Sequence, residues 1–590
     1  MIKLANSRIQ FALVAGAFAY VLFFGMSFLI DPLGQVPVLD ARENITWANV
    51  LRAGSLPEEP IYRALLYPLV LANLPAASLP AAATFFGLAM HVFSAVLVGL
   101  IARRLWANTS AAWLAGLLFA VYPVALYFAG QVLDITFSIT LFLAGLYALL
   151  RCMDAESPRA RLLWGLLAGI VGGLAVLARP NFLPAVLFFP VVVIFAKSRP
   201  WPASIAIAAG LALMLCGQGF VNQKLSGDFR LMPWQGAYNL YAANREGANG
   251  KYYMQRVSFE EVRAGANTTR MESEILYRQA VGQDAPLNID DMSSHWRARL
   301  IDEVAADPLR WLGLMSRKVI YVFNDWEQYN NLTYAYHQAR LPLLAGNPLG
   351  WGVLLLAAFA GLFIGYTKSS RPACYAIALL GLAYAAGLLL FFVSARFRLP
   401  LAPLLCIAAG GCVFLRLPLS LRQGGSLLVG IAGLSILSFG NWFEAKDRVT
   451  FIQDELLLAN ASSQVGDDLQ ALELSRAVLA RDPLRAEAQR LELASLFNLW
   501  LVAAEPNYWQ ALGDSLGTIK SSDASVGFIR GVYLWREGQP AGATQSWQAA
   551  VQAYGTPAQS SADALQAIGK LPRVSARAGA IERMRNILKH

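Results

Sequence analysis

A short polar stretch after the first apolar segment holds the residues best suited to chemistry. It contains Asp40, Arg42 and Glu43, and Arg63 follows it. A carboxylate within hydrogen-bond reach of a hydroxyl can take its proton during a transfer reaction, and an arginine can hold a phosphate through paired N–H groups. We therefore predict that Asp40 is a general base and that Arg63 binds phosphate. Alone, an acid in such a loop is more often a solvated charge, so Asp40 is singled out by its neighbours.

Other charged residues stand where later apolar segments begin or end. Arg396 and Arg398 are two residues apart at such a boundary, which suits a phosphate or pyrophosphate at a membrane surface; anchoring to anionic lipid is the alternative. Arg179 lies in a similar turn, where it either binds phosphate or extends its charge to lipid head groups. Asp134 begins an apolar segment and is predicted as a second catalytic acid facing a polar cavity, or as a charge favoured by the helix dipole.

Aromatic, amide and acidic side chains accompany these charges. Such a mixture suits a carbohydrate, because ring faces stack on the sugar while amides and carboxylates bind its hydroxyls, although a turn-rich loop has a similar composition. The predicted sugar- or acceptor-binding residues are Glu43, Tyr62, Tyr67, Trp234, Asn239, Tyr241, Asn249, Asp325 and Glu327.

The elements that must position these residues are membrane helices. Of 590 residues, 56% are hydrophobic and only 15% charged, whereas soluble proteins carry about a quarter charged residues. The apolar residues form continuous blocks of roughly 18–20, which is the length of a membrane-spanning helix and not the alternation of a barrel strand. The net charge of +10 falls largely in short turns between these blocks, so it indicates topology and not nucleic-acid binding.

The blocks predict about eleven transmembrane helices. With the N-terminus in the cytoplasm, the short basic turns all fall on the cytoplasmic side, and the loops 31–82 and 221–348 and everything after residue 440 fall on the outer face. The predicted location is therefore the bacterial cytoplasmic membrane with an extracytoplasmic C-terminal domain. The predicted spans are about 11–30, 83–101, 111–128, 131–150, 162–178, 183–196, 202–220, 349–366, 373–392, 399–415 and 424–440.

The composition changes to that of a soluble helical domain over residues 441–590. A glycine followed five residues later by a small residue occurs twice, as in tetratricopeptide (TPR) repeats, in which small residues let two helices cross closely. Residues 486–530 are predicted to supply degenerate helices between the two repeats. We expect this domain to dock a protein or glycan acceptor. The repeated positions are Gly466, Ala471 and Pro483, and Gly538, Ala543, Trp547 and Ala550.

The order of these motifs over residues 1–440 resembles that of the bacterial membrane glycosyltransferases of the GT-C superfamily. The nearest branch is the family 39-like one, which contains protein O-mannosyltransferases and the aminoarabinose transferase of lipid A. The segments that carry the resemblance are Pro37–Asp40, Arg63–Pro68, Gly130–Asp134, Ala178–Pro180, Pro233–Asn249, Asn324–Asn331 and Ser394–Pro400.

This resemblance implies a GT-C-type helical bundle and an inverting hexosyl or pentosyl transfer from a polyprenyl-phosphate-linked sugar to a hydroxyl of a protein, lipid or glycan. It implies that Asp40 is the general base. The chain departs from the family pattern in having Arg42–Glu43 after Asp40 and Gly130–Gln131 in the second outer turn, so a second acid must be Asp134 or be absent. The resemblance leaves a divalent cation open, and the residues themselves predict no set of metal ligands.

Two other functions are compatible with the sequence. One is a non-catalytic, membrane-anchored repeat scaffold of an envelope polysaccharide assembly, although eleven spans with polar outer loops exceed what an anchor needs. The other is a flippase or polymerase of lipid-linked sugars, which should bury charges inside several spans, whereas these apolar blocks have few.

Overall fold

The computed structural model describes residues 2–56, 59–193, 201–257, 267–366, 371–415, 420–446, 450–503, 505–519 and 524–554. Within these ranges the chain is helical, and its one β-type pairing is an isolated bridge between Asn330 and Leu332. The predicted all-α class is confirmed. The chain divides into two compact units, Met1–Leu29 with Leu39–Val449 and Ile30–Val38 with Thr450–His590.

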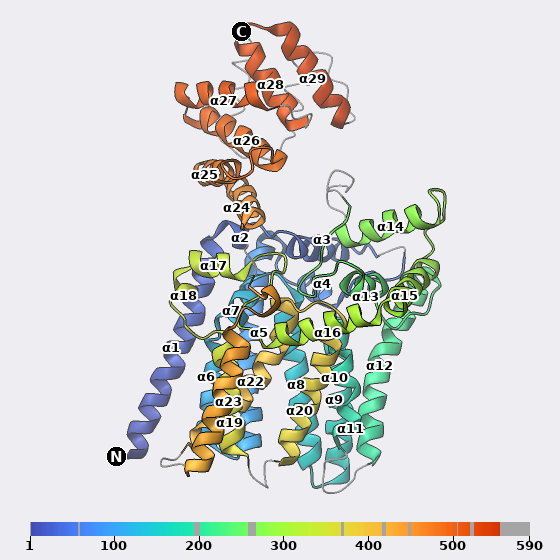
Figure 1. Ribbon diagram of the computed structural model, residues 1–590, viewed down its shortest axis with the longest axis vertical. Helices are drawn as coiled ribbons and strands as arrows, with labels where there is room; N and C mark the ends of the chain where they lie inside the picture. The colour runs from blue at the N-terminus through green and yellow to red at the C-terminus, as the bar shows by residue number, and fades with distance from the viewer. Residues whose placement is uncertain are drawn as a thin grey trace. The chain divides into compact units, whose positions relative to one another are not determined.

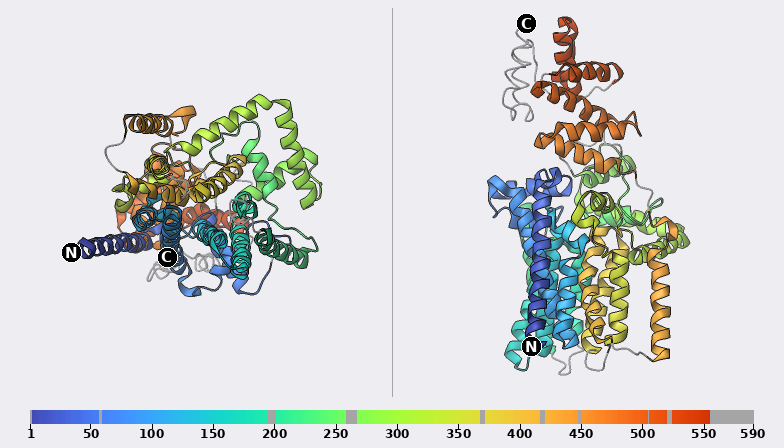
Figure 2. Two further views of the ribbon diagram at one scale, coloured as in Figure 1. Left: turned by 90° about the horizontal axis from the view of Figure 1, so that it is seen from below. Right: turned by 90° about the vertical axis from the view of Figure 1, so that its left-hand side faces the viewer.

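The first unit is a bundle of long helices with shorter ones at its ends (Figure 1). Two further views show the long helices running alongside one another (Figure 2). The long helices are α1 (Ile2–Ile30), α5 (Leu79–Trp106), α8 (Asp134–Asp154), α9 (Pro158–Ala178), α12 (Trp201–Ser226), α20 (Arg371–Leu390) and α23 (Leu421–Phe439). The shorter ones are α3 (Asp40–Arg52), α4 (Leu66–Leu71), η1 (Ala76–Ser78), α6 (Thr109–Ala120), α7 (Pro123–Gly130), η2 (Pro180–Phe182), α10 (Leu183–Leu187), α11 (Phe189–Val192), α13 (Gly236–Asn244), α14 (Thr268–Val281), α15 (Ile289–Ala306), α16 (Pro308–Phe323), α17 (Tyr334–Arg340), α18 (Pro342–Ala345), α19 (Trp351–Gly365), α21 (Ala395–Arg398), η5 (Leu399–Leu401), α22 (Ala402–Ala409), η6 (Gly410–Phe414) and η7 (Trp442–Glu444).

The apolar helices coincide with the predicted spans. Among the described residues, 7 helices are long and apolar enough to cross a membrane, and α6 and α7 form a further pair bent by 52°, where Pro123 opens the second helix. Three shorter apolar segments, Pro180–Val192, Trp351–Gly365 and Cys374–Leu390, lie at the other predicted ranges. The chain is a multi-pass membrane protein, while the number of spans stays a prediction. Residues 194–196 of the predicted span 183–196 lie outside the described residues.

Small residues let the helices approach closely. A methyl group added at Gly169 of α9 would collide with the carbonyl oxygen of Ile207 on α12, and one added at Gly210 would collide with that of Leu166. Contacts through small residues are the usual way to bring helices together in lipid, where apolar burial supplies little driving force. This crossing packs the middle of α9 closely against α12.

The second unit contains helix pairs at the positions that the sequence predicted. Gly466 ends α24 with φ 94° and Gly538 follows α28 with φ 73°, a conformation that glycine adopts readily, while Ala471 and Ala543 are fully buried. The TPR assignment stays a prediction, and residues 555–590 of the predicted domain lie outside the described ones. The helices are α2 (Pro32–Gln35), α24 (Ile452–Val465), α25 (Asp468–Leu479), α26 (Ala486–Ala503), α27 (Pro506–Thr518), α28 (Ala524–Arg536) and α29 (Pro540–Tyr554).

Candidate active site

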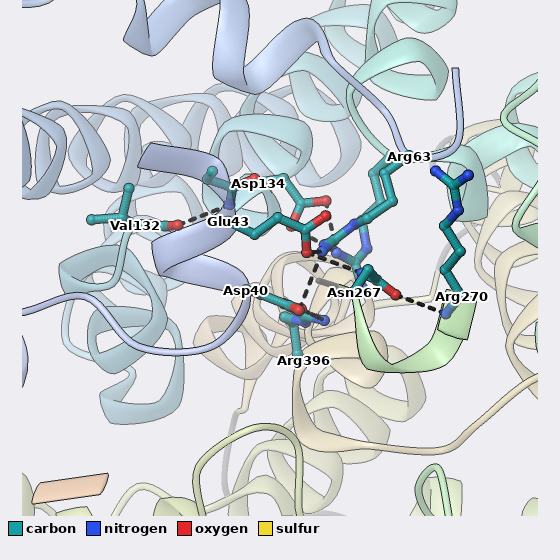
Figure 3. Close-up of polar contacts among 10 residues, drawn as sticks. Asp40, Glu43, Arg63, Val132, Asp134, Asn267, Arg270 and Arg396 are labelled. Atoms are coloured by element: carbon teal, nitrogen blue, oxygen red, sulfur yellow. Dashed lines mark hydrogen bonds and ion pairs between the residues drawn. The ribbon is translucent and has the colours of Figure 1, made fainter. Parts of the chain in front are cut away.

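Four elements bring charged side chains together at one end of the bundle (Figure 3). Asp40 is the first residue of α3, Asp134 is the first residue of α8, Arg179 directly follows α9, and Arg396 lies in the short helix α21. The two acids occupy first turns, where the helix dipole favours negative charge. Residues from four distant parts of the sequence thus form one cluster.

Asp40 is held by two arginines. Its Oδ2 atom lies 2.7 Å from Nη2 of Arg396 and its Oδ1 atom 3.3 Å from Nη1 of Arg63. Burial would raise the pKa of the Asp40 carboxyl, but the charges of Arg63 and Arg396 and a hydrogen bond from Asn331 outweigh it, so this pKa lies well below its ordinary value. Asp40 is therefore ionised and able to accept a proton, yet a weak base in this state.

Arg63 forms ion pairs with two carboxylates. Besides Asp40, it makes a close ion pair with Glu43, whose Oε2 atom also accepts a 3.0 Å hydrogen bond from the side-chain amide of Asn267. Asp134 also acts electrostatically on Arg63. The predicted phosphate role of Arg63 is thus less favoured by this geometry than a role in orienting Asp40 and Glu43.

Arg179 pairs with Asp134 through one nitrogen. Its Nη1 atom donates to both carboxylate oxygens of Asp134 at 3.0 and 2.9 Å. The Arg179 side chain is only 5% exposed, and its Nε and Nη2 atoms have no hydrogen-bond partner among the described residues. Nε and Nη2 form one edge of the guanidinium, which matches two oxygens of a phosphate.

Arg396 also has N–H groups without hydrogen-bond partners among the described residues. Its Nη2 atom binds Asp40, while Nε and Nη1 are buried with no hydrogen-bond partner in the described part of the chain. The ring of Phe397 lies near both arginines, with its centroid 4.7 Å from Cζ of Arg179 and 5.6 Å from Cζ of Arg396. Buried, unsatisfied N–H groups of charged side chains are costly. The two arginines are therefore suited to an anion with several oxygens.

An aromatic pair lies beside Arg270, close to this cluster. The rings of Tyr62 and Trp234 are 4.6 Å apart, and Cζ of Arg270 lies 5.7 and 5.2 Å from their centroids. Arg270 is held in place by ion pairs with Glu59 and Glu274. Burial raises the pKa of Tyr62 and keeps its phenol protonated, so the hydroxyl, which has no hydrogen-bond partner among the described residues, can donate to a ligand.

Tyr67 lies near Asp134 and is 1% exposed. Burial, with the charge of Asp134, raises the pKa of its phenol. Its hydroxyl likewise lacks a partner within the described ranges.

Arg398 is saturated by protein atoms. Its guanidinium donates to the backbone carbonyls of Tyr321, Asn324 and Trp326 and lies 2.9 Å from Glu327. It also stacks 4.3 Å from the centroid of Trp351. Its predicted phosphate role is not favoured by this placement.

Several predicted sugar-binding residues have hydrogen-bond partners outside the cluster. Asp325 accepts a 2.6 Å hydrogen bond from the backbone N–H of Gly352 at the start of α19. The hydroxyl of Tyr241 donates to Glu303, and the side chain of Asn249 accepts from the backbone of the turn that it opens. The half-buried Asn239 lies on α13, which carries Tyr241. Their ligand roles stay predictions.

Four residues of the cluster had no individual role in the sequence prediction. Asn331 and Phe397 lie inside motifs that had been singled out, whereas Asn267 and Arg270 flank the start of α14. Asn331 has a φ of 58°, which is uncommon outside glycine, and no sequence signal marks it. Asn267 is recognisable only as the residue that caps α14.

The acids of the cluster are poorly arranged for a divalent cation. Asp40, Glu43 and Asp134 are each paired with an arginine. The described residues contain no group of three or more His, Cys, Asp or Glu side chains that could hold a metal ion. These residues do not fit the cation that the family resemblance left open.

No family model and no curated protein match the chain. It is similar to the solved structure of ArnT from Cupriavidus metallidurans bound to undecaprenyl phosphate, with 12% identity over 98% of this chain and 84% of that one and a TM-score of 0.38. It is also similar to the apo oligosaccharyltransferase of Archaeoglobus fulgidus, with 13% identity over 85% of this chain and 59% of that one and a TM-score of 0.35.

Proposed function

We propose that the chain is a GT-C-type membrane glycosyltransferase that transfers a sugar from a polyprenyl-phosphate donor to an acceptor hydroxyl. The observation that carries this proposal is the pair Arg179 and Arg396, which offers buried, unpartnered N–H groups beside the carboxylates Asp134 and Asp40. A lipid phosphate supplies the oxygens that these groups lack, and a carboxylate beside it supplies the base.

The transfer is a single displacement that inverts the anomeric centre. The acceptor oxygen forms a bond to the anomeric carbon while Asp40 takes the hydroxyl proton. The bond between that carbon and the phosphate oxygen breaks, and the electron pair leaves with the lipid phosphate. Arg179 and Arg396 bind the charge that develops on this leaving group. The reaction needs no nucleotide, because the phosphate leaves directly.

The sugar and acceptor are assigned to the side of the cluster on which Tyr62 and Trp234 lie. Tyr62, the residue before Arg63, has a buried phenol hydroxyl without a hydrogen-bond partner among the described residues, and its ring and that of Trp234 pack against each other and against Arg270. Aromatic side chains together with a few hydrogen-bonding groups suit a sugar. We assign the aromatic pair to the sugar or to the acceptor.

We assign the reaction to the outer face of the membrane. Asp134 opens α8 whereas Arg151 lies in its last turn, and Arg103 and Arg104 lie in the last turn of α5. The site and these basic residues are thus at opposite ends of the helices. Basic residues favour the cytoplasmic side, which supports an extracytoplasmic site.

The test is the transfer of labelled sugar from membrane polyprenyl phosphate to endogenous acceptors. Asp40→Asn should reduce transfer by about 10²–10⁴-fold, the usual contribution of a general base. Asp291→Asn is a matched control, because Asp291 is an exposed acid in the first turn of α15, and it should transfer normally. Equal transfer by the parent and Asp40→Asn would refute the base assignment. An absence of transfer in the parent would favour the repeat scaffold.

A further inference from the structure

The two oxygens of Asp40 have different partners. Oδ1 lies 3.3 Å from Arg63, which a second acid, Glu43, also holds in place. Oδ2 lies 2.7 Å from Arg396. Arg63 thus fixes the orientation of the carboxylate, whereas the Arg396 contact decides how firmly Oδ2 is neutralised.

The guanidinium of Arg396 can contact Asp40 and a ligand at the same time. One nitrogen binds Asp40, and its other two are buried without partners among the described residues. Other charges act on the same guanidinium, namely the nearby Arg179 and Asp134. An anion that binds either free nitrogen would therefore share a single positive charge with Asp40.

We propose that the sugar donor activates the base: phosphate bound to Arg396 raises the proton affinity of Asp40, so that the carboxylate becomes an effective base only when the donor is present. This inference rests on the proposed function. Its physical basis is that a phosphate on the far side of Arg396 offsets the charge that neutralises Oδ2, and it adds a negative charge nearby. Arg63 and Asn331 keep the carboxylate in position meanwhile.

The coupling must act in both directions. If bound phosphate favours protonated Asp40, then protonated Asp40 favours bound phosphate by the same factor. A neutral side chain at position 40 should therefore bind the phosphate group more tightly while being unable to accept a proton. A residue that merely supports the fold would lose binding and activity together.

The experiment measures binding of decaprenyl methyl phosphate, a diester with one fixed negative charge, to the full-length chain in detergent. The parent should bind it more tightly at about pH 3 than at about pH 7.5, because Asp40, whose pKa lies well below its ordinary value, takes up a proton on binding only in acid. Asp40→Asn should bind it on the order of tenfold more tightly at pH 7.5 and should show a smaller pH dependence. A thermal unfolding measurement confirms that each variant is folded.

Glu43→Gln separates this coupling from a general charge effect. Glu43 contacts Arg63 but has no contact with Arg396 among the described interactions, so this variant should gain clearly less affinity than Asp40→Asn. An equal gain in both variants would overturn the proposal. Equal binding by the parent and Asp40→Asn at both pH values would overturn the coupling and leave the donor site standing. An absence of diester binding in folded protein would overturn both the coupling and the proposed donor.

Discussion

Arg396 and Arg398 are two residues apart and were predicted to do the same thing, yet they have opposite surroundings. Arg396 lies against Asp40 and keeps two buried nitrogens without partners among the described residues. Arg398 is surrounded by three backbone carbonyls, Glu327 and the ring of Trp351. Residues two apart on a helix point about 200° away from each other, so one faces the cluster and the other faces the interior.

The difference separates a binding arginine from a structural one. A guanidinium has five N–H groups, and whatever the protein leaves unused is available to a ligand. Arg398 joins the segment 321–327 to α19 and α21, which fixes the end of the bundle. Arg396 and Arg179 retain N–H groups for a ligand in the cluster. Burial and charge are alike in the two positions, so the count of satisfied N–H groups is the informative property.

The largest effect expected is on stability. Arg398→Gln should reduce the free energy of unfolding by about 3–5 kcal/mol, because Glu327 and three carbonyls lose their partner in a buried place. Thermal unfolding in detergent measures this, with the exposed Arg278→Gln as control. The double variant Arg398→Gln/Glu327→Gln should recover part of the loss. If the Arg398→Gln protein is stable but fails to bind phosphate, Arg398 is a binding residue and not a structural one.

Arg396→Gln should act on transfer and leave stability nearly unchanged. We expect a reduction of about 10²–10³-fold, the usual effect of removing one group that stabilises developing charge. Its unfolding temperature should stay close to that of the parent, because its side chain makes one ion pair and leaves two nitrogens unused. Initial rates at saturating acceptor measure the first effect. A large loss of stability with proportionate loss of activity would make Arg396 structural.

Lys318 extends the comparison to a buried cation without an acid partner among the described residues. Its Nζ atom donates to Asn244 and to the carbonyl of Leu389, and burial lowers its pKa to about 7. The unfolded chain keeps this proton until about pH 10.5, so it binds more protons than the folded chain between the two values, and stability should rise with pH over that interval. Lys318→Met should weaken this rise in thermal unfolding scans. An unchanged pH profile would mean that Lys318 stays charged when folded.

The smallest effect concerns Asp325, which was predicted to bind sugar. Asp325→Ala should destabilise the protein by about 1 kcal/mol, the typical effect of losing a side chain that caps a helix start, because Asp325 accepts from Gly352 in the first turn of α19. The KM for the lipid donor should not change. A rise in KM without a change in unfolding temperature would restore the predicted role.

The sequence indicated which charged residues lie in the cluster better than it indicated the role of each residue. Asp40, Glu43, Arg63, Asp134, Arg179 and Arg396 all came from segments beside membrane helices, and the structure brings them together. Asn331 and Asn267 were not given roles, because an amide becomes important only through what lies next to it. Asp325 and Tyr241 have the right chemistry for sugars but are engaged by protein groups.

The sequence by itself determined that the chain is a multi-pass helical membrane protein and that charged residues collect where its helices end. Hydrocarbon admits only long apolar segments whose backbone is bonded internally, so both properties can be read from composition and periodicity. Only the tertiary structure decided which arginines are saturated and which retain free N–H groups. That outcome depends on which carbonyls and carboxylates distant segments bring within about 3 Å, and no local pattern records those distances.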